Sequence, residues 1–312
     1  MSKVWLPSSA EFSSRREETP PADPAGEQNF LLKVSRPGFW LTSVWFYMLP
    51  VGGADVFGSW KFWLGCFYVT FPLGLLIYGW NDLADFETDR RNPRKGTFLF
   101  GAKGTREQLG RLPLQIAAVQ LPFFLIFTWL EGARMLAWIF ALVGATAIYN
   151  MPKGGLKARP PFELLNQMGY LLVFVLSSWL NDVPQLPWFG FVFGALFAMH
   201  SHLFGQIMDV VPDRLAGRRT SATVIGVIPA KCLLLLLLAT EAALVFASTG
   251  DLFLSAFLGL AALWFAADVA FLWRDRLYAT WQMRIFLLGW NAVALLSLPF
   301  VWRSAALTLL KP

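Results

Sequence analysis

Charged side chains are scarce in this chain. Only 15% of its 312 residues are Asp, Glu, Lys or Arg, whereas 56% are hydrophobic. A soluble domain has about 25% charged residues. The composition therefore excludes an ordinary soluble protein and indicates an integral, multi-pass membrane protein. We expect no nucleic-acid partner.

The chain has only two cysteines, and residues 1–30 lack the features of a targeting peptide. Cys66 and Cys232 lie in apolar segments without metal-ligand spacing, so we expect packing residues and no disulfide. Residues 1–30 contain no apolar run, which argues against a signal peptide, and their acidic residues argue against a transit peptide. We predict a disordered cytoplasmic tail over 1–30 and one membrane domain over 31–312.

Long apolar segments make up most of the remaining sequence. Each has about the 17 to 25 residues that a helix needs to cross a bilayer. The sequence predicts an all-α bundle of nine transmembrane helices around a central cavity. The expected spans are 39–57, 60–80, 112–130, 133–150, 164–181, 187–205, 224–248, 252–273 and 285–302.

Basic residues are unevenly divided between the two sides defined by these spans. One side has 22 Lys and Arg residues and the other has 4. The positive-inside rule then places the N-terminus and the acidic loops in the cytoplasm. We expect a bacterial inner membrane.

An acidic cluster closes the second expected span. Asp82, Asp85 and Asp89 fall within about 60° of arc on a continuous helix, and Asn81 widens that arc to about 100°. Glu87 points to the opposite side. Carboxylates beside a bilayer are costly unless they are paired, and oxygen ligands suit Mg²⁺. The alternative interpretation is a solvated helix end.

A second acidic cluster closes the sixth span. Asp209 and Asp213 are one helical turn apart, and extending the helix backwards adds Gln206 and His202 to the same face. Pro212 is expected to kink or end the helix. Because both clusters lie on the same side of the membrane, they could face each other across the cavity. For Gln206 and His202, a hydrogen bond between helices is an equal alternative to a substrate contact.

Basic residues follow each cluster, and Tyr149 and Lys153 follow the fourth span. A tyrosine and a lysine at positions i and i+4 can jointly hold a phosphate oxygen. Most of the loop bases are expected to be ordinary cytoplasmic charges. Those considered as ligand contacts include Arg94 and Arg214.

Three motifs in this order resemble those of the UbiA superfamily of intramembrane prenyltransferases. They are N-D-x-x-D-x-x-x-D at 81–89, Y-x-x-x-K at 149–153 and D-x-x-x-D at 209–213. With the nine spans, the resemblance covers about residues 33–302. It implies transfer of an isoprenyl group from an allylic isoprenyl diphosphate to a lipophilic acceptor.

The resemblance also implies roles for individual residues. Mg²⁺ would bridge the diphosphate and five aspartates, namely Asp82, Asp85, Asp89, Asp209 and Asp213. The catalytic residues would be Asp82, Asp85, Asp209, Asp213, Tyr149 and Lys153. By the same resemblance, Arg36 and Asn166 are candidate substrate contacts. The positions of Asn81, Arg94, Gln206 and Arg214 beside the acidic clusters make them further candidates for substrate binding.

Departure of the diphosphate would leave an allylic carbocation within an apolar cavity that excludes water. Trp and Phe rings could stabilise this cation. No dedicated general base is apparent, so the proton lost after alkylation is expected to leave to water or diphosphate.

The acceptor is less narrowly indicated. The stretches 35–41 and 219–226 resemble the subgroup that adds isoprene units to carotenoids such as lycopene. Quinone precursors, chlorophyll-type acceptors and phosphosugars remain alternatives. Prenyl chain length and oligomeric state are not specified by the residue pattern.

Two other functions compete with prenyl transfer. A cation-coupled transporter could use the carboxylates as ion sites, but such sites usually lie near the bilayer midplane, whereas these clusters lie at helix ends. A catalytically silent membrane scaffold would not need both clusters.

Overall fold

A computed structural model describes residues 26–308, and within that range the chain is helical. The predicted tail lies outside the described residues except for 26–30, where the first helix begins. The described part contains no strand beyond one isolated bridge between Thr97 and Gly101. The all-α fold class is therefore confirmed.

The first half of the chain contains the helices that carry and surround the first acidic cluster, at 81–89. They are α1 (Gly26–Val34), η1 (Pro37–Phe39), α2 (Trp40–Met48), α3 (Trp60–Tyr68), α4 (Phe71–Ala84), α5 (Phe86–Asp89), α6 (Arg106–Glu131) and α7 (Ala133–Asn150).

The second half contains short elements followed by long helices. They are η2 (Leu156–Ala158), α8 (Phe162–Leu165), η3 (Asn166–Leu171), α9 (Leu172–Leu180), α10 (Trp188–Leu215), α11 (Ser221–Ile225), α12 (Val227–Thr249), α13 (Leu252–Ala270) and α14 (Thr280–Ser304).

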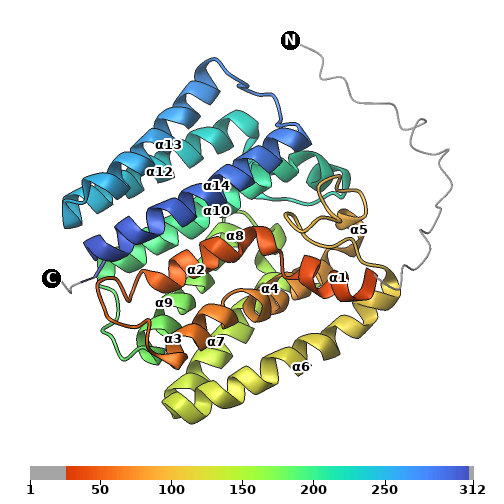
Figure 1. Cartoon of the computed structure of the whole chain (residues 1–312). Helices are drawn as coiled ribbons and strands as arrows, with labels where there is room; N and C mark the ends of the chain where they lie inside the picture. The colour runs from red at the N-terminus through yellow and green to blue at the C-terminus, as the bar shows by residue number, and fades with distance from the viewer. Residues whose placement is uncertain (1–25, 309–312) are drawn as a thin grey trace.

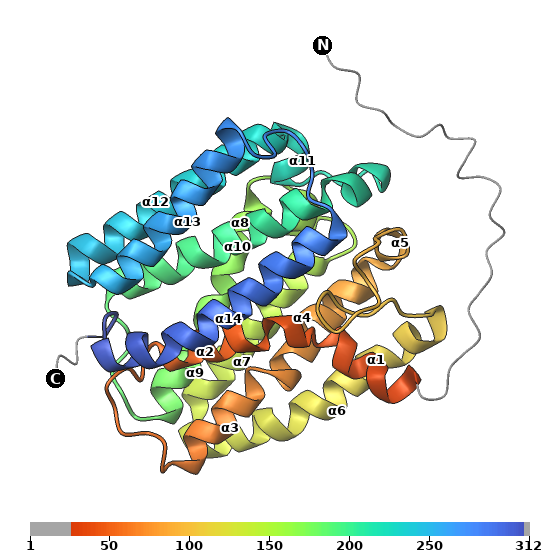
Figure 2. The same ribbon diagram turned by 45° about the horizontal axis from the view of Figure 1, so that its top comes forward.

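The long helices pack into one bundle with α6 at one edge and the α12–α13 hairpin at the opposite edge (Figures 1 and 2). Helices α10 and α14 cross the middle. The short α5 and the segment containing α11 lie toward the same end of the bundle (Figure 2). The connections that carry the two acidic clusters are therefore at one end.

Seven helical segments among the described residues are long and apolar enough to cross a membrane. They are 60–84, where α3 and α4 follow each other, and α6, α7, α10, α12, α13 and α14. The chain is therefore an integral multi-pass membrane protein. Nine spans were predicted, and that exact count is not confirmed.

The other two predicted spans are not uninterrupted long α-helices. After α2, residues 49–58 form turns around Pro50, Gly52 and Gly53, which do not support a helix interior. The predicted span 164–181 is divided into α8, the 3₁₀ segment η3 and α9. The hydrophobic pattern predicts the position of both segments, but it does not predict where a helix is interrupted by turns or changes to a 3₁₀ helix.

The chain bends at the first acidic cluster. Helix α4 ends at Ala84, and Asp85 separates it from α5 with φ −106° and ψ 8°. The continuous helix assumed through Asp89 is therefore wrong. By contrast, α10 continues through Pro212 to Leu215, so Pro212 does not end the helix.

Candidate active site

A cavity of about 710 Å³ lies inside the bundle. Its charged lining residues come from the ends of α4 and α10, from the loops that follow them, from the turn before η1 (Arg36) and from η2 (Lys157). Its apolar lining comes from positions further inside the bundle, including Phe46, Phe197, Phe257 and Trp290. The cavity thus has a charged end and an aromatic interior.

Asp85 is the most heavily paired carboxylate of the first cluster. It is buried, and one oxygen lies 2.5 Å from Lys157 Nζ while the other accepts a hydrogen bond from Arg218. Asn81 Nδ2 also donates to it at 3.2 Å. The bend after α4 therefore brings Asp85 to two cations from distant segments.

Asp82 lies behind the cavity wall instead of lining it. Its Oδ1 accepts from Arg36 at 2.9 Å and from Lys95 at 2.6 Å, and both cations line the cavity. Lys95 Nζ also lies 2.8 Å from Asp89 Oδ2. Asp82 is thus placed to fix two cationic lining residues. Glu87 is largely exposed, in agreement with its predicted direction.

The second cluster faces the loop that follows the first. Asp209 Oδ1 accepts hydrogen bonds from Asn92 at 2.9 Å and from Arg94 Nε at 3.1 Å. Asp213 is buried, and its Oδ1 lies 3.5 Å from Arg218. Asp209 and Asp213 both line the cavity.

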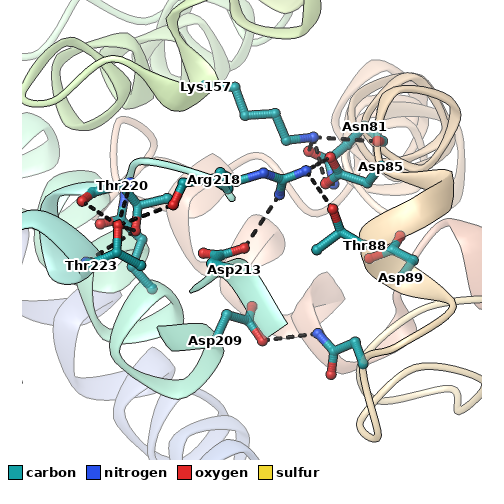
Figure 3. A network of polar contacts seen from close by, with 12 residues as sticks. Asn81, Asp85, Thr88, Asp89, Lys157, Asp209, Asp213, Arg218, Thr220 and Thr223 are labelled. Atoms are coloured by element: carbon teal, nitrogen blue, oxygen red, sulfur yellow. Dashed lines mark hydrogen bonds and ion pairs between the residues drawn. The ribbon is translucent and has the colours of Figure 1, made fainter. Parts of the chain in front are cut away.

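Arg218 joins the two clusters directly (Figure 3). Its guanidinium group contacts both Asp85 and Asp213 and donates to Thr88 Oγ1 at 3.1 Å. The prediction that the clusters face each other across the cavity is therefore supported. From the sequence, Arg218 was only one of several basic residues in the loop after the second cluster.

Lys157 takes the position that the motif pattern predicted for Lys153. Lys153 is exposed and does not line the cavity, whereas Lys157 lines it and contacts Asp85 and both oxygens of Asn81. Its Nζ also lies 5.7 Å from the centre of the Tyr149 ring. A turn after α7 directs Lys153 away and returns the chain through η2 to place Lys157.

Tyr149 does line the cavity, as predicted. Its hydroxyl lies 3.2 Å from His202 Nε2, so α7 and α10 are connected at this level. His202 also lines the cavity. This hydrogen bond between helices is one of the two alternatives considered for His202.

The remaining predicted contacts fall into two groups. Arg36, Arg94, Asn81, Asn166 and Gln206 line the cavity, whereas Arg214 is exposed and lies away from it. Gln206 bridges α8 and α11, because it donates to Glu163 at 3.3 Å and accepts from the Ala222 amide at 3.2 Å.

Glu163 was not identified from the sequence. It is fully buried, and its Oε1 also accepts from the Ser221 amide at 2.6 Å. This contact fixes the start of α11, three residues after Arg218. The available signal was its position as a carboxylate directly before the fifth predicted span, 164–181.

Burial and neighbouring charges shift the pKa values of ionisable residues in the loops around the cavity. Burial raises the pKa of Asp89 to about 6; the charge of Lys95 opposes this shift, and those of Asp82 and Asp85 add to it. Burial lowers the pKa of Lys157 to about 8 despite the charge of Asp85. For Asp85, the charges of Lys157 and Arg218 outweigh burial and lower the pKa.

These shifts predict a bell-shaped pH profile for catalysis. Below about pH 6, Asp89 becomes protonated and loses its negative charge; above about pH 8, Lys157 becomes neutral and no longer supplies a cation at the charged end of the cavity. We expect kcat/KM in detergent to fall outside this window. A Lys157→Arg variant should move the alkaline limb upwards, and an unchanged limb would contradict the assignment.

The donor groups fit Mg²⁺. Asp85, Asp89, Asp209 and Asp213 offer carboxylate oxygens, and Asn92 offers an amide oxygen from the same lining. Among the described residues, no three His, Cys, Asp or Glu side chains form a ready-made metal cage. Mg²⁺ does not require one, because it commonly binds through one or two carboxylates together with substrate phosphates and water.

Comparison with known proteins identifies related chains. The UbiA prenyltransferase family profile matches residues 39–292. A lycopene elongase/hydratase of Corynebacterium glutamicum is 30% identical over 207 residues, covering 63% of this chain and 69% of the relative. One from Haloarcula japonica is 29% identical over 202 residues, covering 63% and 67%. A C(50) beta-cyclic carotenoids biosynthesis protein of Dietzia sp. is 30% identical over 202 residues, covering 62% and 45%.

Solved structures share the fold. A UbiA homolog from Archaeoglobus fulgidus, bound to DMAPP and Mg²⁺, aligns with a TM-score of 0.67 at 16% identity, covering 90% of this chain and all of the other. A second homolog, from Aeropyrum pernix K1, aligns with a TM-score of 0.54 at 16% identity, covering 89% and 96%. At this identity the likeness concerns the fold alone.

Proposed function

Because the chain belongs to the UbiA prenyltransferase family, we propose that it transfers an isoprenyl group from an allylic isoprenyl diphosphate to a carotenoid acceptor in a Mg²⁺-dependent reaction. The observation that carries this proposal is the pair of acidic clusters at the charged end of one cavity, joined by Arg218. Family membership also removes most of the support for the cation-coupled transporter.

The charged end is suited to a diphosphate with its metal. Arg218, Lys157, Arg94 and Lys95 line this end and supply positive charge for the leaving group. The carboxylates Asp85, Asp89, Asp209 and Asp213 would hold Mg²⁺. When bound, Mg²⁺ would neutralise charge on the diphosphate and so stabilise its departure.

Arg36 and Lys95, two cations that line the cavity, are held in place without substrate. Arg36 and Lys95 are fixed by Asp82, and Arg36 also stacks 4.4 Å above the centre of the Tyr78 ring. Preorganised charges stabilise a transition state without needing to reorient during the reaction. We therefore assign Asp82 to positioning the diphosphate-binding cations, in addition to the metal role expected from its motif.

The interior of the cavity is suited to the hydrocarbon parts of both substrates. The C–O bond to diphosphate breaks, and the π electrons of the acceptor double bond form the new C–C bond. Phe and Trp side chains exclude water, and their ring faces stabilise positive charge. Loss of a proton, or addition of water with loss of a proton, neutralises the acceptor cation.

The choice of a carotenoid acceptor rests on the names of the sequence relatives and on the stretches 35–41 and 219–226. These stretches are part of the site: Arg36 and Thr220 line the cavity, and α11 begins at Ser221. We therefore prefer a lycopene-type polyene to quinone precursors, chlorophyll-type acceptors or phosphosugars.

The proposed topology follows from charge. The basic loops and the charged end of the cavity would face the cytoplasm of a bacterial cell, where water-soluble isoprenyl diphosphates are available. The polyene would enter from membrane lipid.

The direct test is turnover by purified full-length protein in lipid nanodiscs. Lycopene or a quinone precursor is supplied as acceptor, together with dimethylallyl, geranyl or geranylgeranyl diphosphate, in the presence of Mg²⁺ or of EDTA, and apolar products are analysed by mass spectrometry. We expect a Mg²⁺-dependent product heavier by one prenyl unit. A product only with a quinone precursor would overturn the carotenoid assignment, and none with any acceptor would overturn prenyl transfer.

A further inference from the structure

A second polar pair lies deep in the bundle, away from the diphosphate end. His200 on α10 places Nδ1 2.6 Å from Oε1 of Glu241 on α12. Glu241 is fully buried and has no exposed surface, and its Oε2 has no hydrogen-bond partner among the described residues. Such a carboxylate within an apolar bundle is costly, which indicates a function beyond packing.

The imidazole of this pair is part of the cavity wall. His200 lines the cavity. The centre of its ring lies 4.9 Å from the ring centre of Phe197 and 6.3 Å from that of Trp290. Helices α10 and α12 pack against each other (Figure 2), and Glu241 is buried and does not itself line the cavity. A proton on Nδ1 donated to Glu241 leaves a lone pair on Nε2.

The pair lies at the depth in the cavity where the acceptor cation of the proposed reaction would be neutralised. His200 precedes Asp209 by nine residues on α10, which places it roughly 14 Å deeper along the helix. This separation leaves room for the diphosphate and the transferred group. His202 lies closer to the diphosphate end, and its Nε2 already faces the Tyr149 hydroxyl.

We propose that His200, oriented by Glu241, accepts the proton released when the carbocation left on the acceptor is neutralised. This inference rests on the proposed prenyl transfer and supplies the general base that the sequence motifs did not indicate. His200 is then a catalytic residue, and Glu241 is a positioning residue.

The proton that His200 accepts can come from a C–H bond beside the cation or from a water molecule that attacks the cation. If the C–H bond beside the cation breaks, its electron pair forms a new double bond and His200 Nε2 takes the proton. If water attacks the cation instead, its oxygen forms the C–O bond and His200 takes a proton from that water. Either route leaves an imidazolium beside the Glu241 carboxylate, a stabilising pair in an apolar site.

The test uses full-length protein in nanodiscs with Mg²⁺, lycopene and the most active allylic diphosphate in H₂¹⁸O. The variants are Glu241→Gln and the double variant His200→Phe with Glu241→Leu, which leaves no buried unpaired charge. We expect prenylated carotenoid to fall about 100-fold in the double variant, the usual effect of losing a general base. We expect a smaller fall in Glu241→Gln.

The ratio of free prenyl alcohol to prenylated carotenoid should rise in the same variants, and affinity for the diphosphate should not change. Label in the wild-type product identifies water as the proton donor, and its absence identifies a C–H bond.

A matched control separates this role from helix packing. Gln120 accepts from the Tyr68 hydroxyl at 3.0 Å and donates to the Pro72 carbonyl at 2.7 Å, and neither Tyr68 nor Gln120 lines the cavity. Gln120→Leu should lower Tm without changing the product ratio. An unchanged rate and ratio in the double variant would overturn the inference while leaving prenyl transfer intact. A wild-type protein without prenyl transfer would overturn both.

Discussion

Replacing Asp85 with Asn should lower kcat/KM for prenyl transfer by about 1,000-fold. Asp85 is buried at the charged end of the cavity, where it contacts Lys157 and Arg218 and faces the second cluster through that arginine. The substitution keeps the shape but removes a charge proposed to bind metal, and electrostatic groups of this kind contribute about 2.7–4 kcal/mol to the transition state. Steady-state kinetics across a Mg²⁺ titration measures the loss.

The neighbouring Glu87→Gln variant is the matched control. Glu87 has the same charge and lies two residues away, but its side chain is 67% exposed and its ion pair with Arg106 is 3.6 Å long. Exposed pairs contribute little, so we expect activity within about twofold of wild type. An equal loss in both variants would contradict the specific role of Asp85.

Lys157→Met should reduce kcat/KM by about 100-fold or more, whereas Lys153→Met should have almost no effect. Lys157 Nζ lies 2.5 Å from Asp85 and contacts Asn81, so its charge is fixed at the site of the proposed leaving group. Lys153 is exposed outside the cavity. Parallel kinetics of the two variants distinguishes the residue chosen by motif spacing from the one chosen by geometry.

The Asp85–Lys157 pair provides a second check. Lys157→Met leaves Asp85 paired with Arg218, so the variant should remain folded and keep a symmetric gel-filtration peak. Full activity in Lys157→Met with loss in Lys153→Met would show that the loop after α7 adopts another arrangement during catalysis.

Several features were predictable because they depend on local sequence. Asp85 and Asp89 follow a long apolar segment, and Asp209 and Asp213 are one turn apart, so both clusters could be located without tertiary information. Tyr149 was identified for the same reason. Helix continuity was less predictable: the chain bends at Asp85 and α10 continues through Pro212, so local helix propensity decides neither point.

The sequence by itself determined the membrane class, the all-α architecture, the family resemblance and the two acidic clusters, because hydrophobic length and motif spacing are recorded within short segments. Only the tertiary structure distinguished Lys157 from Lys153, joined the clusters through Arg218, placed Asp82 behind the wall and paired His200 with Glu241. These pairings connect residues that are far apart in sequence, and helix packing decides which of them meet.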